Sequence, residues 1–371
     1  MDRTKRRRRQ VALGVLIGVA LGAFALGAAL GDGRTPEPSA AGTLPLRQLS
    51  GQRIVVGLGG EGVTQPLRRA IRAGEVAGVV LLGYDLPSRA AARRLIARLQ
   101  GIKRPVKLRD PLLIMVDQEG GLVKRLGGAP SASAAEMGDR GPAYSRRQGR
   151  LAAANLRNVG INVDLAPVLD VARPGGVIAA TGRAFGESAK RVTSTAIPFA
   201  QALQNGGVAA TGKHFPGFGT ARENTDFAKQ RLELSKRELR RVDEAPFRAF
   251  AAAGGDLVML STAIYPALAR QPAAFSRRIA TGELRGRVGF EGVSITDALN
   301  TVAVDAYGGP TRAGLAAARA GVDLLLYARL GPAERARQAL VRKLRAGKLS
   351  RAGFVASVQR VLELRAELGG G

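Results

Sequence analysis

The most restrictive feature of this sequence is a series of eight short apolar runs, rich in Val, Ile and Leu. The runs are RIVVGLGG (53–60), VAGVVLLG (76–83), PLLIMVDQEGG (111–121), INVDLAPVLDV (161–171), VAATGKHFPG (208–217), DLVMLSTAIYP (256–266), VSITDALN (293–300) and VDLLLYAR (322–329). Because nearly every position in them is apolar, both faces of each predicted strand must be buried, which is typical of a parallel sheet.

Amphipathic segments separate most of these runs and predict helices. They cover residues 86–101, 142–159, 188–205, 236–253 and 310–321. Eight strand–helix units predict an α/β fold, a (β/α)8 barrel of the TIM type. An open doubly wound sheet is the alternative, but GLGGEGVTQ after the first run is a poor match to a dinucleotide-binding fingerprint.

The amino terminus predicts the location of the protein. A basic stretch, MDRTKRRRRQ, precedes an uncharged run at residues 11–30, which is long enough to span a bilayer. Residues 1–31 are therefore a signal-anchor or a signal peptide, and their length favours an anchor that holds the protein in the membrane. The basic flank would leave the rest of the chain extracytoplasmic, either membrane-anchored or secreted.

The remaining chain divides into two parts. Residues 32–49 are predicted to be a linker, and residues 50–371 a barrel domain whose last stretch, 333–370, forms two closing helices against the outer wall. The chain has no cysteine and a single histidine, which excludes disulfides, thiolate metal sites and multi-histidine metal sites. No metal or other cofactor is expected.

The chain carries 57 Lys and Arg against 29 Asp and Glu, a net charge of +28. Such a charge favours anionic partners. However, basic runs such as RAAARRLIARLQ (89–100) alternate with alanine and leucine at helical spacing, so we place most of the charge on solvated helix faces. No nucleic-acid-binding motif is visible, and no nucleic-acid partner is expected.

Polar side chains follow several of the predicted strands. Asp117 ends the third predicted strand, Asp170 the fourth, Lys213 and His214 the fifth, and Asp297 the seventh. In a (β/α)8 barrel the carboxyl ends of the strands meet at one rim, where active sites are built. Carboxylates with cationic neighbours suit a polyhydroxylated ligand, and glycoside hydrolysis needs a nucleophilic carboxylate and a proton donor.

Five motifs resemble those of glycoside hydrolase family 3. They are VDQEGGLVKRL (116–126), INVDLAPVLDV (161–171), GRAFGE (182–187), KHFPGFG (213–219) and ITDALN (295–300). Their order and spacing are similar to the single-domain β-N-acetylglucosaminidase (β-N-acetylhexosaminidase) branch, over roughly residues 50 to 330. The resemblance implies a retaining enzyme that works through a covalent glycosyl-enzyme.

The resemblance also implies roles for individual residues. Asp297 would be the nucleophile, and Asp117, Arg183, Lys213 and His214 would bind the sugar. Asp170 would order the rim without reacting.

The chain departs from this branch in the loop after the fifth strand. The branch reads KHFPGHG and then an Asp-Ser-His triplet whose histidine donates the proton; here Phe218 replaces the first histidine and Asn224-Thr225-Asp226 occupies the triplet. Because no second histidine exists, the candidate acid-base residues are Asp226 and the neighbouring Glu223. A carboxyl group can act as the acid when burial or a like charge raises its pKa.

The sequence therefore predicts a retaining exo-β-glycosidase that releases terminal β-linked N-acetylglucosamine, with peptidoglycan fragments as candidate substrates. A weak hydrolase that depends on activated leaving groups is one alternative. Others are a membrane-tethered cell-wall glycan-binding protein and a β-glucosidase-type enzyme. The intact Asp297 argues against a pure binder, because binding needs no nucleophile.

Overall fold

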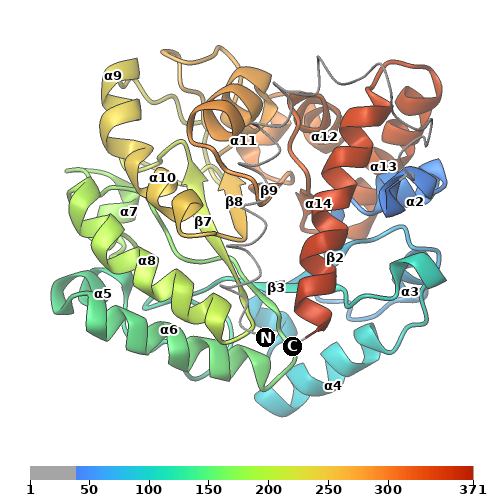
Figure 1. Cartoon of the computed structure of the whole chain (residues 1–371), viewed down its shortest axis with the longest axis horizontal. Coiled ribbons are helices and arrows are strands. Elements are labelled where there is room, and N and C mark those ends of the chain that lie inside the picture. Colours follow the sequence, from blue (N-terminus) through green and yellow to red (C-terminus); the bar gives the residue numbers. More distant parts are fainter. Residues whose placement is uncertain (1–38, 371) are drawn as a thin grey trace, which may run out of the picture. The chain divides into compact units, whose positions relative to one another are not determined.

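The computed structural model describes residues 39–370 (Figure 1). The predicted signal or anchor segment at residues 11–30 lies outside this range, so it stays a prediction. Between residues 39 and 370, no helix combines the length and the apolar character needed to cross a bilayer. The folded unit begins at Ala40.

Eight parallel strands form one sheet in the described chain. They are β1 (Ile54–Gly57), β2 (Gly78–Leu81), β3 (Leu113–Val116), β6 (Val163–Asp164), β7 (Ala209–Phe215), β8 (Leu257–Leu260), β9 (Val293–Thr296) and β10 (Leu325–Tyr327). Neighbours in the sheet follow chain order, and β10 also pairs with β1. A parallel bridge between Ile295 and Leu324 closes the ring. The predicted TIM-type barrel is confirmed, and each strand falls inside a predicted run.

Strand residues alternate between two apolar layers. Val55, Leu113 and Met115 belong to a cluster inside the barrel, whereas Ile54 and Val56 pack with the surrounding helices. Because successive side chains point to opposite faces of a strand, a run without polar residues fills both layers at once.

Helices surround the barrel (Figure 1). They are α2 (Leu46–Gly51), α3 (Gln65–Arg72), α4 (Arg89–Gln100), α5 (Ala134–Arg140), α6 (Pro142–Arg157), α7 (Val177–Ala180), α8 (Ala189–Asn205), α9 (Lys236–Glu238), α10 (Ala245–Ala252), α11 (Val302–Asp305), α12 (Gly309–Ala320), α13 (Leu330–Arg345) and α14 (Arg351–Gly369). Short 3-10 turns are η1 (Ala40–Thr43), η2 (Gly83–Asp85), η3 (Val106–Leu108) and η5 (Ala273–Phe275), and π-helical turns are η4 (Leu239–Asp243) and η6 (Arg278–Arg287).

Small residues allow two of these helices to pack closely. A Cβ on Gly149 of α6 would lie 2.5 Å from the carbonyl oxygen of Phe199 in α8. A larger residue at this position would push the helices apart.

The amino end of the barrel differs from the prediction in two ways. The predicted linker at residues 32–49 extends too far, because Ala41, Leu44 and Leu49 are buried in the core. The two terminal helices do not both cover the outer wall. Val361 and Leu364 of α14 join the cluster inside the barrel, so α14 closes the amino end of the barrel, while α13 packs beside α12 on the outside.

A buried arginine holds α14 in this place. Arg365 is fully buried and donates to the carbonyl oxygens of Leu108, Asp110 and Pro111, which precede β3. This arrangement leaves the opposite, carboxyl end of the strands free for a site.

Candidate active site

A small pocket opens at the carboxyl ends of the strands, where the predicted site residues gather. Its volume is about 220 Å³, below the range typical of pockets for drug-sized ligands. Among its lining residues are Asp117, Arg125, Arg183, Lys213, His214, Phe218, Asn224, Asp226 and Asp297. A larger surface cavity of about 650 Å³ lies between α5, α7 and the start of α8, but none of the predicted site residues lines it.

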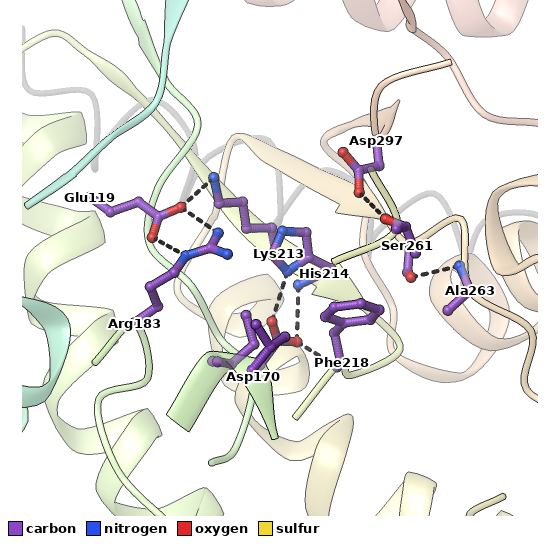
Figure 2. A network of polar contacts seen from close by, with 12 residues as sticks. Glu119, Asp170, Arg183, Lys213, His214, Phe218, Ser261, Ala263 and Asp297 are labelled. Carbon is purple, nitrogen blue, oxygen red and sulfur yellow. Dashed lines mark hydrogen bonds and ion pairs between the residues drawn. The ribbon is translucent and has the colours of Figure 1, made fainter. Parts of the chain in front are cut away.

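Lys213 is the centre of a charged cluster on one wall (Figure 2). Its ammonium group lies 2.6 Å from Asp117 Oδ1 and 2.7 Å from Glu119 Oε1. Glu119 also accepts two hydrogen bonds of 2.8 Å from the guanidinium of Arg183, in bidentate geometry. The ammonium group is almost fully buried, but the carboxyl group of Asp117 is 21% exposed, so Asp117 can reach a ligand while Glu119 holds the cations.

The electrostatics of this cluster keep Glu119 and Lys213 charged. Burial by itself would raise the pKa of Glu119, but the charges and hydrogen bonds of Lys213 and Arg183 outweigh it and lower the pKa to about 2. Burial would lower the pKa of Lys213, whereas Asp117 and Glu119 raise it above its usual value. The cluster therefore presents a fixed set of donors and acceptors that suits sugar hydroxyls.

A further acid, Asp164, lies near this cluster. Asp164, the last residue of β6, is fully buried, and its Oδ1 accepts the backbone N–H of Gln118 at 3.0 Å. Its other oxygen has no hydrogen-bond partner in the described chain. Burial is the main cause that raises the pKa of Asp164 well above its ordinary value, which favours the neutral form of a group that supports the backbone after Asp117.

Asp170 orders the start of the loop that follows β7, which we call the β7 loop. This is the role that the resemblance implied for Asp170. Its Oδ1 accepts the backbone N–H groups of His214 at 3.1 Å and Phe218 at 2.7 Å. Its Oδ2 lies 2.7 Å from Nδ1 of His214. Since a carboxylate only accepts, Nδ1 carries the proton and Nε2 is left for the pocket. The ring of Phe218 packs against the imidazole, with centroids 5.6 Å apart.

Asp297 lies at the end of β9, across the pocket from the charged cluster (Figure 2). Its backbone N–H donates to the carbonyl of Leu260 at 2.9 Å, which continues the pairing of β9 with β8. Its Oδ1 accepts the N–H of Ala298 at 2.7 Å. These contacts fix the carboxyl group of Asp297 on a rigid strand end, as a nucleophile requires.

The β7 loop brings Asp226 to the same pocket. Asp226 accepts from the side-chain amide of Asn224 at 3.0 Å and donates its own N–H to that amide oxygen. The residue as a whole is solvent exposed, but its carboxyl group is partly shielded from water. This shielding is the larger cause, and the charge of Asp297 the next, that raises the pKa of Asp226 above its ordinary value. Glu223, the other candidate acid, is exposed and does not line the pocket.

Glu119 and Arg125 are charged residues of the site that were not predicted from the sequence. Glu119 could have been found, because it lies two residues after Asp117 in an extended segment, where alternate side chains share a side. Arg125 also lines the pocket, and no ion pair of its guanidinium occurs within residues 39–370. Its only signal was its membership of the VDQEGGLVKRL motif.

Comparison with known proteins identifies the family of the chain. The profile described as Glycosyl hydrolase family 3 N terminal domain matches residues 46–364. A protein of Arthroderma benhamiae named "Uncharacterized secreted glycosyl hydrolase" is 38% identical over 329 residues, 86% of this chain and 93% of its own length. A β-hexosaminidase of Xanthomonas oryzae pv. oryzae is 34% identical over 284 residues, 74% of this chain and 82% of that relative.

Two solved structures share the fold. A family 3 β-N-acetylglucosaminidase from Paenibacillus sp. superposes with a TM-score of 0.82 and 33% identity over 88% of this chain, and this chain spans 63% of its length. A β-N-acetylhexosaminidase from Beutenbergia cavernae superposes with a TM-score of 0.80 and 32% identity, over 87% of this chain and 99% of its own. The chain thus belongs to glycosyl hydrolase family 3 and is a glycoside hydrolase.

Proposed function

We propose that the chain is a retaining exo-β-N-acetylhexosaminidase that hydrolyses terminal β-linked N-acetylglucosamine. One observation carries the proposal: Asp297 and Asp226 line a single small pocket that also holds the charged cluster around Lys213. Two carboxyl groups in unlike environments beside a set of hydroxyl-binding groups are what retaining glycoside hydrolysis requires.

In the first step, the carboxylate of Asp297 attacks the anomeric carbon and the bond to the glycosidic oxygen breaks. Asp226 gives its proton to that oxygen, so the aglycone leaves as an alcohol. In the second step, Asp226 takes a proton from water, which attacks the anomeric carbon and releases Asp297.

The pKa of Asp226 suits both steps. While Asp297 is ionised, its charge contributes to the raised pKa of Asp226, which favours the protonated donor. Formation of the glycosyl-enzyme converts Asp297 to a neutral ester, so this contribution is lost and the pKa of Asp226 falls. Asp226 then acts as a base in the second step, and the exposed Glu223 is the less favoured candidate.

The sugar and the location are proposed from the relatives and the sequence. A relative and two structural neighbours are named as β-hexosaminidase, β-N-acetylglucosaminidase and β-N-acetylhexosaminidase, which supports an amino-sugar substrate. Another relative is named as secreted, which supports an extracytoplasmic location with residues 11–30 as the leader or anchor. Peptidoglycan fragments are the substrates we propose there.

The test is hydrolysis of aryl β-N-acetylglucosaminide and aryl β-glucoside by the full-length chain. Asp297→Asn should abolish turnover of the preferred substrate, while Asp305→Asn, which changes an exposed carboxylate of α11, should not. Proton NMR should show the β-anomer of the free sugar as the first product. A first product in the α-configuration would refute the retaining mechanism.

Two other outcomes would change the proposal. If the β-glucoside were cleaved faster than the β-N-acetylglucosaminide, the enzyme would be a β-glucosidase and the proposed amino-sugar specificity would be wrong. Sugar binding without turnover of either substrate would point to a glycan-binding protein, in which Asp297 has no chemical role.

A further inference from the structure

Large apolar side chains are exposed around the mouth of the pocket. Within the described chain, the exposed large apolar residues are Tyr84, Val106, Leu122, Leu151, Phe227 and Val302. Three of them lie one or two residues from a pocket-lining residue: Tyr84 near Leu82, Leu122 beside Val123 and Phe227 beside Asp226. Val302 donates its backbone N–H to the carbonyl of Asp226 at 3.3 Å. Val106 and Leu151 are not near any pocket-lining residue in the sequence.

Phe227 is the most informative of these residues. Its side chain is 72% exposed and does not line the pocket, so packing of the fold does not account for it. It follows Asp226, the proposed proton donor. The pocket has room for about one sugar, so the part of the substrate beyond the glycosidic oxygen must leave the pocket past Asp226. That path leads to Phe227.

The segment that carries Phe227 is held in place. The N–H groups of Phe227 and Ala228 both donate to the carbonyl of Asn224, at 3.0 and 3.1 Å. Thr225 is buried, and its carbonyl accepts the N–H of Ala303 at 3.4 Å. The backbone of the turn is thus tied to α11, and an aromatic ring on a fixed backbone can bind a partner with less loss of conformational freedom than one on a mobile loop.

We propose that Phe227, with Val302 beside it, is a binding platform for a second pyranose on the leaving-group side of the scissile bond. A pyranose has an apolar C–H face and a polar edge of hydroxyls. The face suits the exposed ring, because aromatic faces attract positively polarised hydrogens. The edge suits the exposed charged residues of the same segment, Arg222, Glu223 and Lys229. The enzyme would therefore prefer disaccharide-type glycosides over those with a small aglycone.

This inference rests on the proposed function, and its test separates the two. A β-linked N-acetylglucosamine disaccharide would be hydrolysed by wild type, Phe227→Ala and Phe227→Tyr, with Leu151→Ala as the matched control because Leu151 is an exposed apolar residue of α6. Free N-acetylglucosamine, which fills the pocket alone, would be used as an inhibitor of each variant. Binding of both sugars to Asp297→Asn, with and without Phe227→Ala, gives the same comparison without turnover.

Phe227→Ala should lower kcat/KM for the disaccharide by about tenfold, mainly through KM, which is a usual size for loss of one aromatic contact. Phe227→Tyr and Leu151→Ala should stay within about twofold of wild type. Inhibition by the monosaccharide should not change in any of these variants. The platform would be refuted if Phe227→Ala and Leu151→Ala had the same kcat/KM for the disaccharide. It would also be refuted if Phe227→Ala weakened inhibition by the monosaccharide as much as it lowered kcat/KM for the disaccharide. Failure of wild type to cleave any β-N-acetylglucosaminide would instead refute the proposed function, and the binding ratio would still decide the platform.

Discussion

Glu119→Gln removes the buried carboxylate that bridges Lys213 and Arg183. The depression of the Glu119 pKa from 4.5 to about 2 corresponds to about 3 kcal/mol of stability, at about 1.4 kcal/mol per pKa unit. Because the folded pKa is lower than the unfolded one, this contribution is present above pH 4.5 and is lost as the pH falls toward 2. By pH 3, about 2 kcal/mol of it should be gone.

The assay is urea unfolding of wild type and Glu119→Gln at several pH values between 7 and 3. The free energy of unfolding of the wild type should exceed that of the variant at neutral pH, and this excess should shrink by about 2 kcal/mol on acidification. Glu136→Gln is the control, because Glu136 forms an exposed ion pair with Arg140 that contributes little. An excess that stays constant from pH 7 to pH 3 would refute the assignment of Glu119 as the charge that holds this wall together.

Three further variants test other parts of the structure. Asp226→Asn should slow hydrolysis of a glycoside with a poor leaving group by about 10²–10⁴-fold and remove the fall in rate at high pH. With a good leaving group, azide should restore turnover of this variant by attacking the glycosyl-enzyme, which gives a glycosyl azide. Equal losses with good and poor leaving groups would contradict the role of Asp226. Asp164→Asn should keep the free energy of unfolding within about 1 kcal/mol of wild type at pH 7, because the amide oxygen still accepts the N–H of Gln118. Asp164→Ala should lower it by about 1–3 kcal/mol. Equal losses for the two variants in urea titrations would contradict a neutral Asp164. Arg365→Met should cost about 3 kcal/mol in the same titrations by leaving buried carbonyls unsatisfied, and a loss no larger than that of the exposed Arg345→Met would contradict the anchoring of α14.

The sequence predicted the barrel well because its signal is local. Each strand is buried on both faces, so each reads as an uninterrupted apolar run, and the positions after these runs are the rim by topology alone. Asp117, Lys213, His214 and Asp297 were found in this way, whereas Asp226 was found only through the resemblance to the family, and the structure brings all five to one pocket. A rim position requires only the order of the strands, which the chain order supplies.

The features that were missed depend on contacts between distant segments. Glu119 stabilises the site because Lys213 and Arg183, the latter 64 positions along the chain, reach it. Asp164 reads as an interruption of an apolar run, and the rise of its pKa follows from burial among residues of other strands. The two apolar residues by which α14 enters the barrel, Val361 and Leu364, have the same pattern as residues of a helix on the outer wall. Local patterns cannot separate these cases.

The exchange of a histidine for an aspartate in the β7 loop is consistent with proton transfer because the pocket acts on either group in the same direction. A carboxylate such as Asp297 disfavours a negative neighbour and favours a positive one, so it raises the pKa of an aspartic acid and of an imidazolium alike. Asp226 starts from a lower ordinary pKa than histidine, and enclosure adds to the rise that Asp297 causes. In the proposed mechanism, esterification of Asp297 removes the charge and reverses that part of the shift. Under this proposal, the capacity to give a proton and then to take one follows from the position of the group beside Asp297, and the residue type sets the pH range in which it operates.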